Sequence, residues 1–256
     1  MLLTMDIENT CITLGCFDGD KLCFSAGLSA VRSKTAEEYA IAIRDVLELY
    51  RVDLRKVKYA IMSSVVPGLT SVMKAALSLL LGTEPMVVGP GVKTGLNIRM
   101  DHPASVGTDL VALMVAAIGA YPSPLVVANL GTATTLLASD EKGSYVGAII
   151  APGPITSMDA LAETCDQLPV VALEAPRDVL GKNTVDSMKS GAVYGMAAML
   201  DGLVERAEAQ LGQRCTVVVT GAYAAEIAPH CRREMILDPC LGMKGLRRIF
   251  EKNYKK

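Results

Sequence analysis

The 256-residue sequence has little net charge and no long apolar run, and both absences exclude classes of protein. Its formal charge is −2 at pH 7, so the chain as a whole exerts no attraction on nucleic acid. The one basic stretch is the terminal KGLRRIFEKNYKK, which we interpret as the solvated face of a last helix. No uninterrupted apolar run reaches the roughly 18 residues that a membrane span needs. The sequence therefore predicts neither a nucleic-acid partner nor a membrane partner.

Cysteine pairs with the spacing of metal ligands are also missing. The seven cysteines are scattered and contain no CxxC pair, which argues against a zinc or redox site. We interpret them as reduced and mostly buried. The opening MLLTMD is too short for the apolar core of a signal peptide and lacks its basic start. We therefore expect a cytoplasmic protein, whose apolar content of 51% suffices for one large core or two modest ones.

What the sequence does contain is an internal repeat of strands and turns. The first copy reads MLLTM, the turn DIENT, CITLGCF, the hairpin DGDK and LCFSAGL. The second copy, offset by about 123 residues, reads PLVVA, NLGTAT, TLLAS, DEKG and SYVGAII. A repeat of this size predicts two similar α/β domains, each a mixed sheet with helices, and a ligand cleft between them.

Helical and strand patterns follow each copy of the repeat. Thr35 and Glu38 form a capping box ahead of AEEYAIAIRDVLELY, whose apolar residues have helical spacing. The pattern predicts a buried strand in VKYAIMSSVVPG that stops at Pro67, and a helix in TSVMKAALSLLLG that stops at Gly82. Two further helices are predicted in TDLVALMVAAIGAY and SGAVYGMAAMLDGLVERAEAQLG, and a strand that leads into a glycine turn in CTVVVTGAYA.

The two polar turns of the repeat are candidate phosphate sites. Asp6 precedes the first turn, and the second turn, GTATT from Gly131 to Thr135, offers one glycine and three hydroxyls. Exposed backbone amides and hydroxyls in such turns can bind the phosphates of a nucleotide. The alternative is a plain hairpin whose threonines favour strand. The occurrence of a polar turn in both copies favours phosphate binding.

Several motifs, in this order, resemble those of the type III pantothenate kinases, which belong to the superfamily of acetate and sugar kinases, heat-shock protein 70 and actin. The motifs are SSVVPG, VVGPGVKTGLNIR, HPASVGTDL, LGTATT, IAPG, LGKNTVDSMKSGAVYG, VVVTGAYA and LDPCLGMKGLRRIFEKN. The resemblance implies two ribonuclease H-like (actin-like ATPase) domains, at 1–118 and 119–256. It also implies a dimer that phosphorylates pantothenate with ATP, the first step of coenzyme A biosynthesis, using Mg²⁺ and a monovalent cation, K⁺ or NH₄⁺.

The resemblance further implies roles for single residues. Asp109 matches the catalytic base, although Asp before an apolar helix is, without the resemblance, an ordinary N-cap residue. The residues matched to nucleotide and phosphate binding are Asp6, Asn9, Thr10, Gly131, Thr132, Thr134 and Gly221. Those matched to the pantothenate pocket are Met100, Gly107, Thr108 and Thr184, the last reaching across the dimer interface. Asp6 and Asn129 match the metal positions, with Asn129 at a weakened monovalent-cation site.

The sequence departs from the family's pattern at five positions in or beside these motifs. Glu8 stands where the family has glycine, and it adds bulk and negative charge beside a polyphosphate. Asn129 replaces an aspartate of the cation site, which loses one charge. Leu110 replaces the arginine that clamps pantothenate's carboxylate, and Met100 replaces a tyrosine of the same pocket. Ala222 replaces a second glycine of the adenine-side turn.

Three hypotheses about function follow. The first is a pantothenate kinase, active alone or as one subunit of a hetero-oligomer with an intact paralogue, because Thr184 lies in the unaltered motif GKNTVDSMKSG. The second is a catalytically weakened paralogue that acts as a regulatory or scaffold subunit. The third is an accessory factor acting near transcription, against which the missing basic surface pattern argues.

Overall fold

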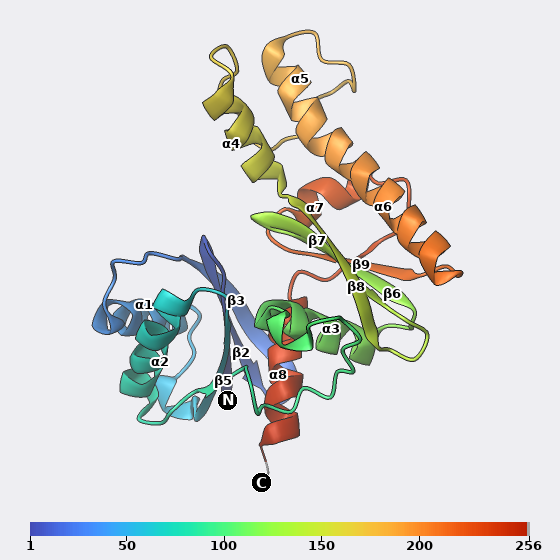
Figure 1. Cartoon of the computed structure of the whole chain (residues 1–256). Helices are drawn as coiled ribbons and strands as arrows, with labels where there is room; N and C mark the ends of the chain where they lie inside the picture. Colours follow the sequence, from blue (N-terminus) through green and yellow to red (C-terminus); the bar gives the residue numbers. More distant parts are fainter. Residues whose placement is uncertain (255–256) are drawn as a thin grey trace. The chain divides into compact units, whose positions relative to one another are not determined.

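The computed structural model describes residues 1–254 and divides the chain into two compact units (Figure 1). The first unit comprises Met1–Leu96, His102–Ala116 and Cys240–Lys256. The second comprises Asn97–Asp101 and Ala117–Pro239. Residues 255 and 256, the end of the expected second domain, lie outside the described residues.

Each unit contains a five-stranded mixed sheet. The strands of the first are β1 (Leu2–Ile7), β2 (Cys11–Asp18), β3 (Lys21–Ser29), β4 (Tyr59–Ser64) and β5 (Met86–Val87), in the order β3-β2-β1-β4-β5. Those of the second are β6 (Leu125–Leu130), β7 (Ala133–Ser139), β8 (Tyr145–Pro152), β9 (Thr216–Thr220) and β10 (Ile236–Leu237), in the order β10-β9-β6-β7-β8.

The two sheets have the same topology, which confirms the predicted repeat. In each, three strands consecutive in sequence pair antiparallel, and two later strands extend the sheet in parallel beside the first of the three. The repeats begin at Leu2 and Leu125, at the expected offset. The short turns follow from this arrangement, because antiparallel neighbours need only a hairpin, whereas parallel neighbours need a crossover.

Four helices accompany the first sheet. They are α1 (Ala36–Leu49), α2 (Pro67–Leu81), α3 (Thr108–Ala120) and α8 (Leu241–Asn253), with 3₁₀ turns at Leu54–Lys56 and Pro103–Ser105. The predicted capping box at the start of α1 is confirmed, since Thr35 and Glu38 exchange hydrogen bonds. α2 starts at Pro67, three residues before its predicted start, because proline's fixed φ suits the first helical position. It ends, as predicted, at Gly82, which has a φ of 68°.

The first sheet is covered on both faces (Figure 1). On one face, Met5 and Ile12 of the sheet pack with Ile43 of α1 and Met73 of α2. On the other face, side chains of the sheet pack against α3 and α8, in a cluster of Leu2, Phe17, Ile61, Val88, Ala112, Met243, Leu246, Ile249 and Phe250. All six residues of β1 are consequently buried, its Asp6 included. A strand buried on both faces has a nearly continuous apolar sequence, as LLTMDI does.

The C-terminal helix differs from the expected domain division. The expected second domain was 119–256, but its described residues from 240 onward belong to the first unit. The reason is the apolar face of α8, whose Leu246 and Ile249 are fully buried in the cluster on the first sheet. Of the stretch predicted to be a solvated face, Glu251 and Lys252 are exposed, whereas the side chain of Arg247 is only 16% exposed and pairs with Asp20.

The second unit contains the remaining helices. These are α4 (Pro154–Thr164), α5 (Thr184–Ser190), a π-helical turn (Gly191–Gly195), α6 (Met196–Leu211), α7 (Ala224–Ile227) and a 3₁₀ turn (Ala228–His230). Its core forms between α6 and the central strands, where Leu200 and Val204 pack with Val126 and Val219. Within residues 1–254, no helix combines the length and the apolarity that crossing a membrane requires.

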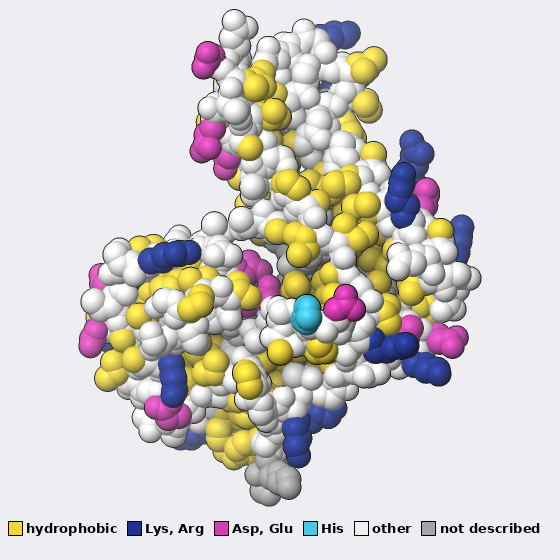
Figure 2. All heavy atoms as spheres, viewed as in Figure 1, with side chains coloured by type: hydrophobic (Ala, Val, Ile, Leu, Met, Phe, Trp, Pro, Cys, Tyr) yellow, Lys and Arg dark blue, Asp and Glu magenta, His cyan; other side chains and the backbone are white. Residues whose placement is uncertain are grey.

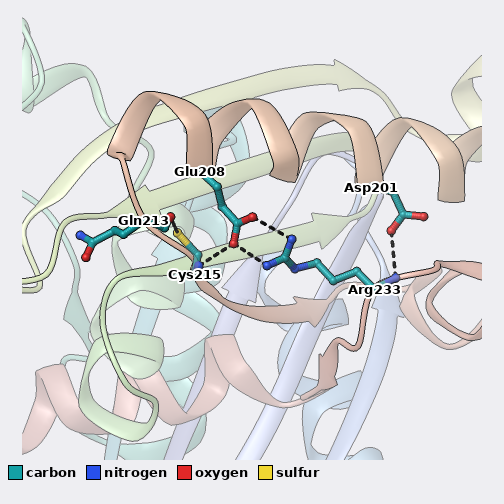
Figure 3. A network of polar contacts seen from close by, with 5 residues as sticks. All are labelled: Asp201, Glu208, Gln213, Cys215 and Arg233. Carbon is teal, nitrogen blue, oxygen red and sulfur yellow. Dashed lines mark hydrogen bonds and ion pairs between the residues drawn. The ribbon is translucent and has the colours of Figure 1, made fainter.

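A mostly buried ion pair joins α6 to the segment that precedes β10 (Figure 3). Arg233 donates to both carboxylate oxygens of Glu208, with Nη1 2.9 Å from Oε2. The same carboxylate accepts the backbone N–H of Cys215 at 2.6 Å, and Asp201, two turns earlier on α6, accepts the N–H groups of Arg232 and Arg233. Because every charged group of the pair has a partner, its burial is tolerated, but the loss of either side chain leaves the other charge uncompensated.

We predict that Glu208→Ala lowers the free energy of unfolding by about 2–4 kcal/mol, since it leaves Arg233 and the Cys215 N–H unpaired in a mostly buried place. Urea denaturation measures the change. The matched control is Glu205→Ala, on an exposed position of the same helix, which gains the same helix propensity without losing a buried partner. Equal stability of the two variants would contradict the prediction.

Candidate active site

The first polar turn follows β1 and is anchored by Asp6. The N–H of Glu8 donates to the carbonyl of Cys11 at 2.9 Å, which closes the predicted turn, and Asn9 and Thr10 are on its outside. Asp6 is 8% exposed, and its Oδ1 accepts a 2.7 Å hydrogen bond from the hydroxyl of Ser63 on β4. Sequence reasoning did not single out Ser63, because its position beside Asp6 depends on the pairing of β1 with β4.

Glu8 takes an ordinary backbone conformation. Within residues 1–254, Arg51 is the only residue other than glycine with a positive φ, so the turn does not require glycine at position 8. Glu8 therefore adds no backbone strain to the turn, and its charge is felt by the neighbouring carboxyl groups. Burial and the charge of Asp109 raise the pKa of its carboxyl above the usual range.

Asp6, Glu8 and Asp109 form an electrostatically coupled group within the first unit. Burial, together with the charges of Glu8 and Asp109, raises the pKa of Asp6 to about 8, and the hydrogen bond from Ser63 opposes the rise. Three carboxylates that repel one another favour a cation among them. Within the described part of the chain, however, no three acidic, His or Cys side chains are placed to hold a metal ion together.

These residues fit Mg²⁺ that is bound jointly with a nucleotide. Mg²⁺ in kinase sites is held by one or two carboxylates together with phosphate oxygens, and it does not need a cage made only of protein ligands. One buried carboxylate, Asp6, with two acidic neighbours is a donor set of that kind.

Asp109 is the second residue of α3, so it lies in the first turn of the helix and not at the N-cap. Its Oδ1 is buried without a hydrogen-bond partner, so this oxygen is free to accept a proton. A Cβ on Gly107 would lie 2.4 Å from that oxygen, so another residue at position 107 would displace the carboxylate from this position. Thr108 ties the turn to β4, because its Oγ1 accepts the N–H of Ser64 at 3.2 Å and donates to the Ser64 carbonyl. Burial raises the pKa of Asp109, which makes the carboxylate a stronger base.

The second polar turn, in the second unit, joins β6 to β7. The N–H of Gly131 donates to the carbonyl of Ala133 at 3.1 Å, and the Thr132 carbonyl accepts bonds from Gly153 and Thr156. The side chain of Thr132 is exposed. Asn129, 8% exposed, is the fifth residue of β6, as Asp6 is of β1, so the two polar residues occupy equivalent positions in the two sheets.

Thr134 differs from its expected place in the phosphate turn. It is fully buried, and its hydroxyl faces the sulfur of Met196 at 3.7 Å. β7 begins at Ala133, so Thr134 already has the alternating orientation of a strand and points into the core. The hydroxyl of its neighbour Thr135 is buried without a hydrogen-bond partner, a feature that no sequence signal indicated.

The glycine turn after β9 packs on the second polar turn. Gly221 has a φ of 100°, and a Cβ there would lie 2.5 Å from the carbonyl of Leu130 and 2.6 Å from Oδ1 of Asn129. Tyr223 donates its N–H to the same Leu130 carbonyl at 3.1 Å. The structure thus brings Asn129, Gly131 and Gly221 together within the second unit.

The residues expected to bind pantothenate come from separate elements. Gly107 and Thr108 adjoin Asp109 in the first unit, whereas Met100 and Thr184 belong to the second. Met100 is half-buried in the segment before α3. Thr184 is exposed at the start of α5, whose N-terminus is capped by Asn183 through the N–H of Asp186 at 2.9 Å.

Comparison with known proteins gives a consistent result. The family model of type III pantothenate kinases matches residues 2–206. A type III pantothenate kinase of Exiguobacterium sp. is 40% identical over 255 residues and covers 100% of both chains. Another, from Moorella thermoacetica, is 40% identical over 253 residues, or 99% of this chain and 100% of its own.

A solved structure supports the fold. The activator of 2-hydroxyisocaproyl-CoA dehydratase from Clostridium difficile, with bound ADPNP, superposes with a TM-score of 0.59 over 100% of this chain and 98% of its own. Its sequence identity is 12%, so this likeness concerns the fold alone.

We predict that Asp6→Asn stabilises the metal-free chain, and more so as the pH rises. Asp6 holds its proton up to about pH 8 in the folded state but releases it near its ordinary pKa when unfolded, so folding binds a proton between these values. Stability therefore falls with rising pH over this window, and Asn removes the fall. Between pH 5 and pH 9 the advantage of the variant should widen by on the order of 3 kcal/mol.

Urea denaturation in the presence of EDTA measures this advantage. Asp18→Asn, an exposed aspartate at the end of β2, is the control and should follow the wild type at both pH values. A constant difference between Asp6→Asn and the wild type would show that Asp6 is ionised in the folded chain throughout.

Proposed function

Because the chain belongs to the type III pantothenate kinase family, we propose that it phosphorylates pantothenate with ATP and that Asp109 is the catalytic base. The observation that supports the assignment of Asp109 is its buried Oδ1, which has no hydrogen-bond partner and lies in the first turn of α3. The relatives from Exiguobacterium and Moorella both carry the name of the kinase and do not favour the regulatory alternative.

In the proposed reaction, Asp109 accepts the proton of the pantothenate hydroxyl as its oxygen attacks the γ-phosphorus of ATP. The new O–P bond forms while the bond to the β-phosphate oxygen breaks, and ADP leaves. Because such transition states are loose, the protein contributes mainly position and charge. Asp6, Asn9, Thr10, Gly131, Thr132 and Gly221 are the groups we propose for the nucleotide, with Thr134 supporting the turn from the core.

Mg²⁺, when bound, neutralises charge on the phosphates as it does in other kinases. We propose Asp6 as its protein ligand. A monovalent cation, K⁺ or NH₄⁺, is proposed at Asn129, whose amide keeps an oxygen ligand but has no charge. Weaker dependence on that cation follows from the substitution.

The pantothenate pocket is proposed at Met100, Gly107, Thr108 and Thr184, with the last acting across a subunit interface. Exposed apolar side chains in the segment between α4 and α5 support an interface. Val170 and Leu180, in the segment before α5, are 81% and 84% exposed, and Figure 2 shows hydrophobic side chains at the surface over α4 and α5. Patches of this kind mark protein contacts.

We further propose that the partner is an intact paralogue, because Leu110 lacks the charge to clamp pantothenate's carboxylate within this chain. The cytoplasm is the proposed compartment, because all seven cysteines are free thiols, which such compartments keep reduced.

Phosphate transfer from ATP to pantothenate by the purified chain, alone and with any paralogue of the same genome, tests the proposed function. Transfer by the chain alone supports a self-sufficient kinase, and transfer only in the mixture supports the hetero-oligomer. No transfer in either case overturns the proposed function.

In the active assembly, Asp109→Asn should lower kcat by roughly 10²-fold or more, since it removes a positioned base. Its stability should be unchanged or slightly higher, because the amide escapes the cost of burying a charge. Steady-state kinetics and thermal unfolding measure the two effects, with Asp18→Asn as a control that should retain activity. Wild-type turnover in Asp109→Asn would assign the base to another group.

The double variant Glu8→Gly, Leu110→Arg should gain activity as an isolated chain. Glycine removes a negative charge beside the phosphates, and arginine supplies a carboxylate partner worth about 1.5–3 kcal/mol per charged hydrogen bond. Each single variant should improve only one substrate, ATP for Glu8→Gly and pantothenate for Leu110→Arg, as calorimetry would measure. Tight binding of both substrates to the unmodified chain would contradict this explanation of the substitutions.

A further inference from the structure

Ser63 contacts Asp6 directly. The two residues lie opposite each other in the parallel pairing of β1 with β4, and the Ser63 hydroxyl donates to Oδ1 of Asp6 at 2.7 Å. Ser63 is 0% exposed, so water cannot replace this bond. A serine hydroxyl has one proton to donate, and here the Asp6 carboxylate accepts it.

The repeat places a hydroxyl at the equivalent position of the second unit. There Thr220 of β9 lies opposite Asn129 of β6, as Ser63 lies opposite Asp6, and Thr220 is 3% exposed. In both sheets, a buried hydroxyl residue on the parallel neighbour strand therefore accompanies the polar residue at the end of the central strand. Because the same placement occurs in both sheets, we interpret Ser63 as having a role beyond filling space in the core.

The residue after Ser63 ties the same strand to Asp109. The backbone N–H and carbonyl of Ser64 both bond to the hydroxyl of Thr108, one residue before Asp109. The end of β4 is thus connected to Asp6 through a side chain and to the start of α3 through the backbone. One short segment of β4 therefore contacts both Asp6 and the residue that precedes Asp109.

We propose that Ser63 is a positioning residue for the proposed phosphoryl transfer: its hydroxyl holds Oδ1 of Asp6 and leaves Oδ2 to Mg²⁺ bound with the nucleotide. The inference rests on the proposed function of Asp6. A carboxylate held by one oxygen keeps a single orientation, and partners of this kind commonly change metal affinity 10- to 100-fold when they are removed. Ser63 itself touches neither substrate nor metal.

A matched pair of variants tests the hydroxyl. Ser63→Thr keeps it and Ser63→Val lacks it, while the two side chains have nearly the same volume, so their packing costs in the buried site are alike. Ser63→Ala removes the hydroxyl without adding bulk. It tests the loss of the hydroxyl even if both larger variants fail to fold. The control is Thr4→Val on β1, which removes a fully buried hydroxyl that bonds to the Gly15 carbonyl instead of a carboxylate.

The measurements are calorimetric affinity for ADP with Mg²⁺, the Mg²⁺ concentration for half-maximal activity, and KM for pantothenate. In Ser63→Ala and Ser63→Val, the affinity for ADP with Mg²⁺ should weaken about 10-fold or more, and the Mg²⁺ requirement should rise likewise. KM for pantothenate should stay within about twofold, and Ser63→Thr should lie closer to the wild type than Ser63→Val. Thr4→Val should lose stability without a change in Mg²⁺ dependence.

Wild-type affinity for ADP with Mg²⁺ in Ser63→Ala overturns the inference. So does an equal loss in Ser63→Ala and Thr4→Val, since it would reflect destabilisation alone. If the wild type binds ADP with Mg²⁺ but phosphorylates no pantothenate in any assembly, the proposed function fails, while the calorimetric comparison still decides the role of Ser63. Failure of the wild type to bind ADP with Mg²⁺ overturns both.

Discussion

The parallel pairing of β1 with β4 is the constraint on which the candidate site of the first unit depends. It brings the carboxyl ends of two buried strands side by side, so that Asp6 at the end of one meets Ser63 at the end of the other. The polypeptide leaves β4 at Ser64, and the Thr108 hydroxyl binds that residue's backbone and thereby fixes the start of α3. Asp109 follows directly. Asp6 and Ser63 are remote in the sequence, and they lie side by side because the direction and register of β1 and β4 fix which residues face each other.

This arrangement is costly for the fold. β1 is buried along its whole length, and the helices on both faces of the sheet keep water from Asp6. An ionised carboxylate in such a place destabilises the folded chain until a cation reaches it, and Glu8 and Asp109 add to the repulsion. The rest of the unit contributes the stability that offsets this cost, above all the apolar packing of α1, α2, α3 and α8. Stability and the proposed metal-binding role of Asp6 therefore make opposite demands on the same residue.

The duplication shows how two copies of one topology diverge. Asp6 and Asn129 occupy the same position of their sheets, yet the first is an acid within an acidic group and the second is an amide in contact range of Gly221. Gly221 adopts a left-handed conformation, and no other side chain would fit between it and the end of β6. The second unit is thus built for close backbone approach, whereas the first concentrates charge.

The sequence by itself determined those features that local chemistry decides. The strand repeat, the capping box of Thr35 and Glu38, and the end of α2 at Gly82 each follow from neighbouring residues, and the structure has all three. The turn at Asp6 and the helix start at Asp109 belong to the same class, since their residue types are recognisable where they stand. A departure such as Glu8 is visible in the sequence too, but its ordinary backbone conformation is not.

Only the tertiary structure decided which distant residues meet. α8 packs on the first unit because the second face of that sheet needs an apolar cover, a demand that no stretch of the last 20 or so residues expresses. The inward orientation of Thr134 depends on where β7 begins, and a one-residue change of register would reverse it. The bond from Ser63 to Asp6 joins residues 57 positions apart in the sequence. Such contacts are set by strand order and strand register. These depend on the packing of the whole core, so local sequence patterns do not encode the contacts.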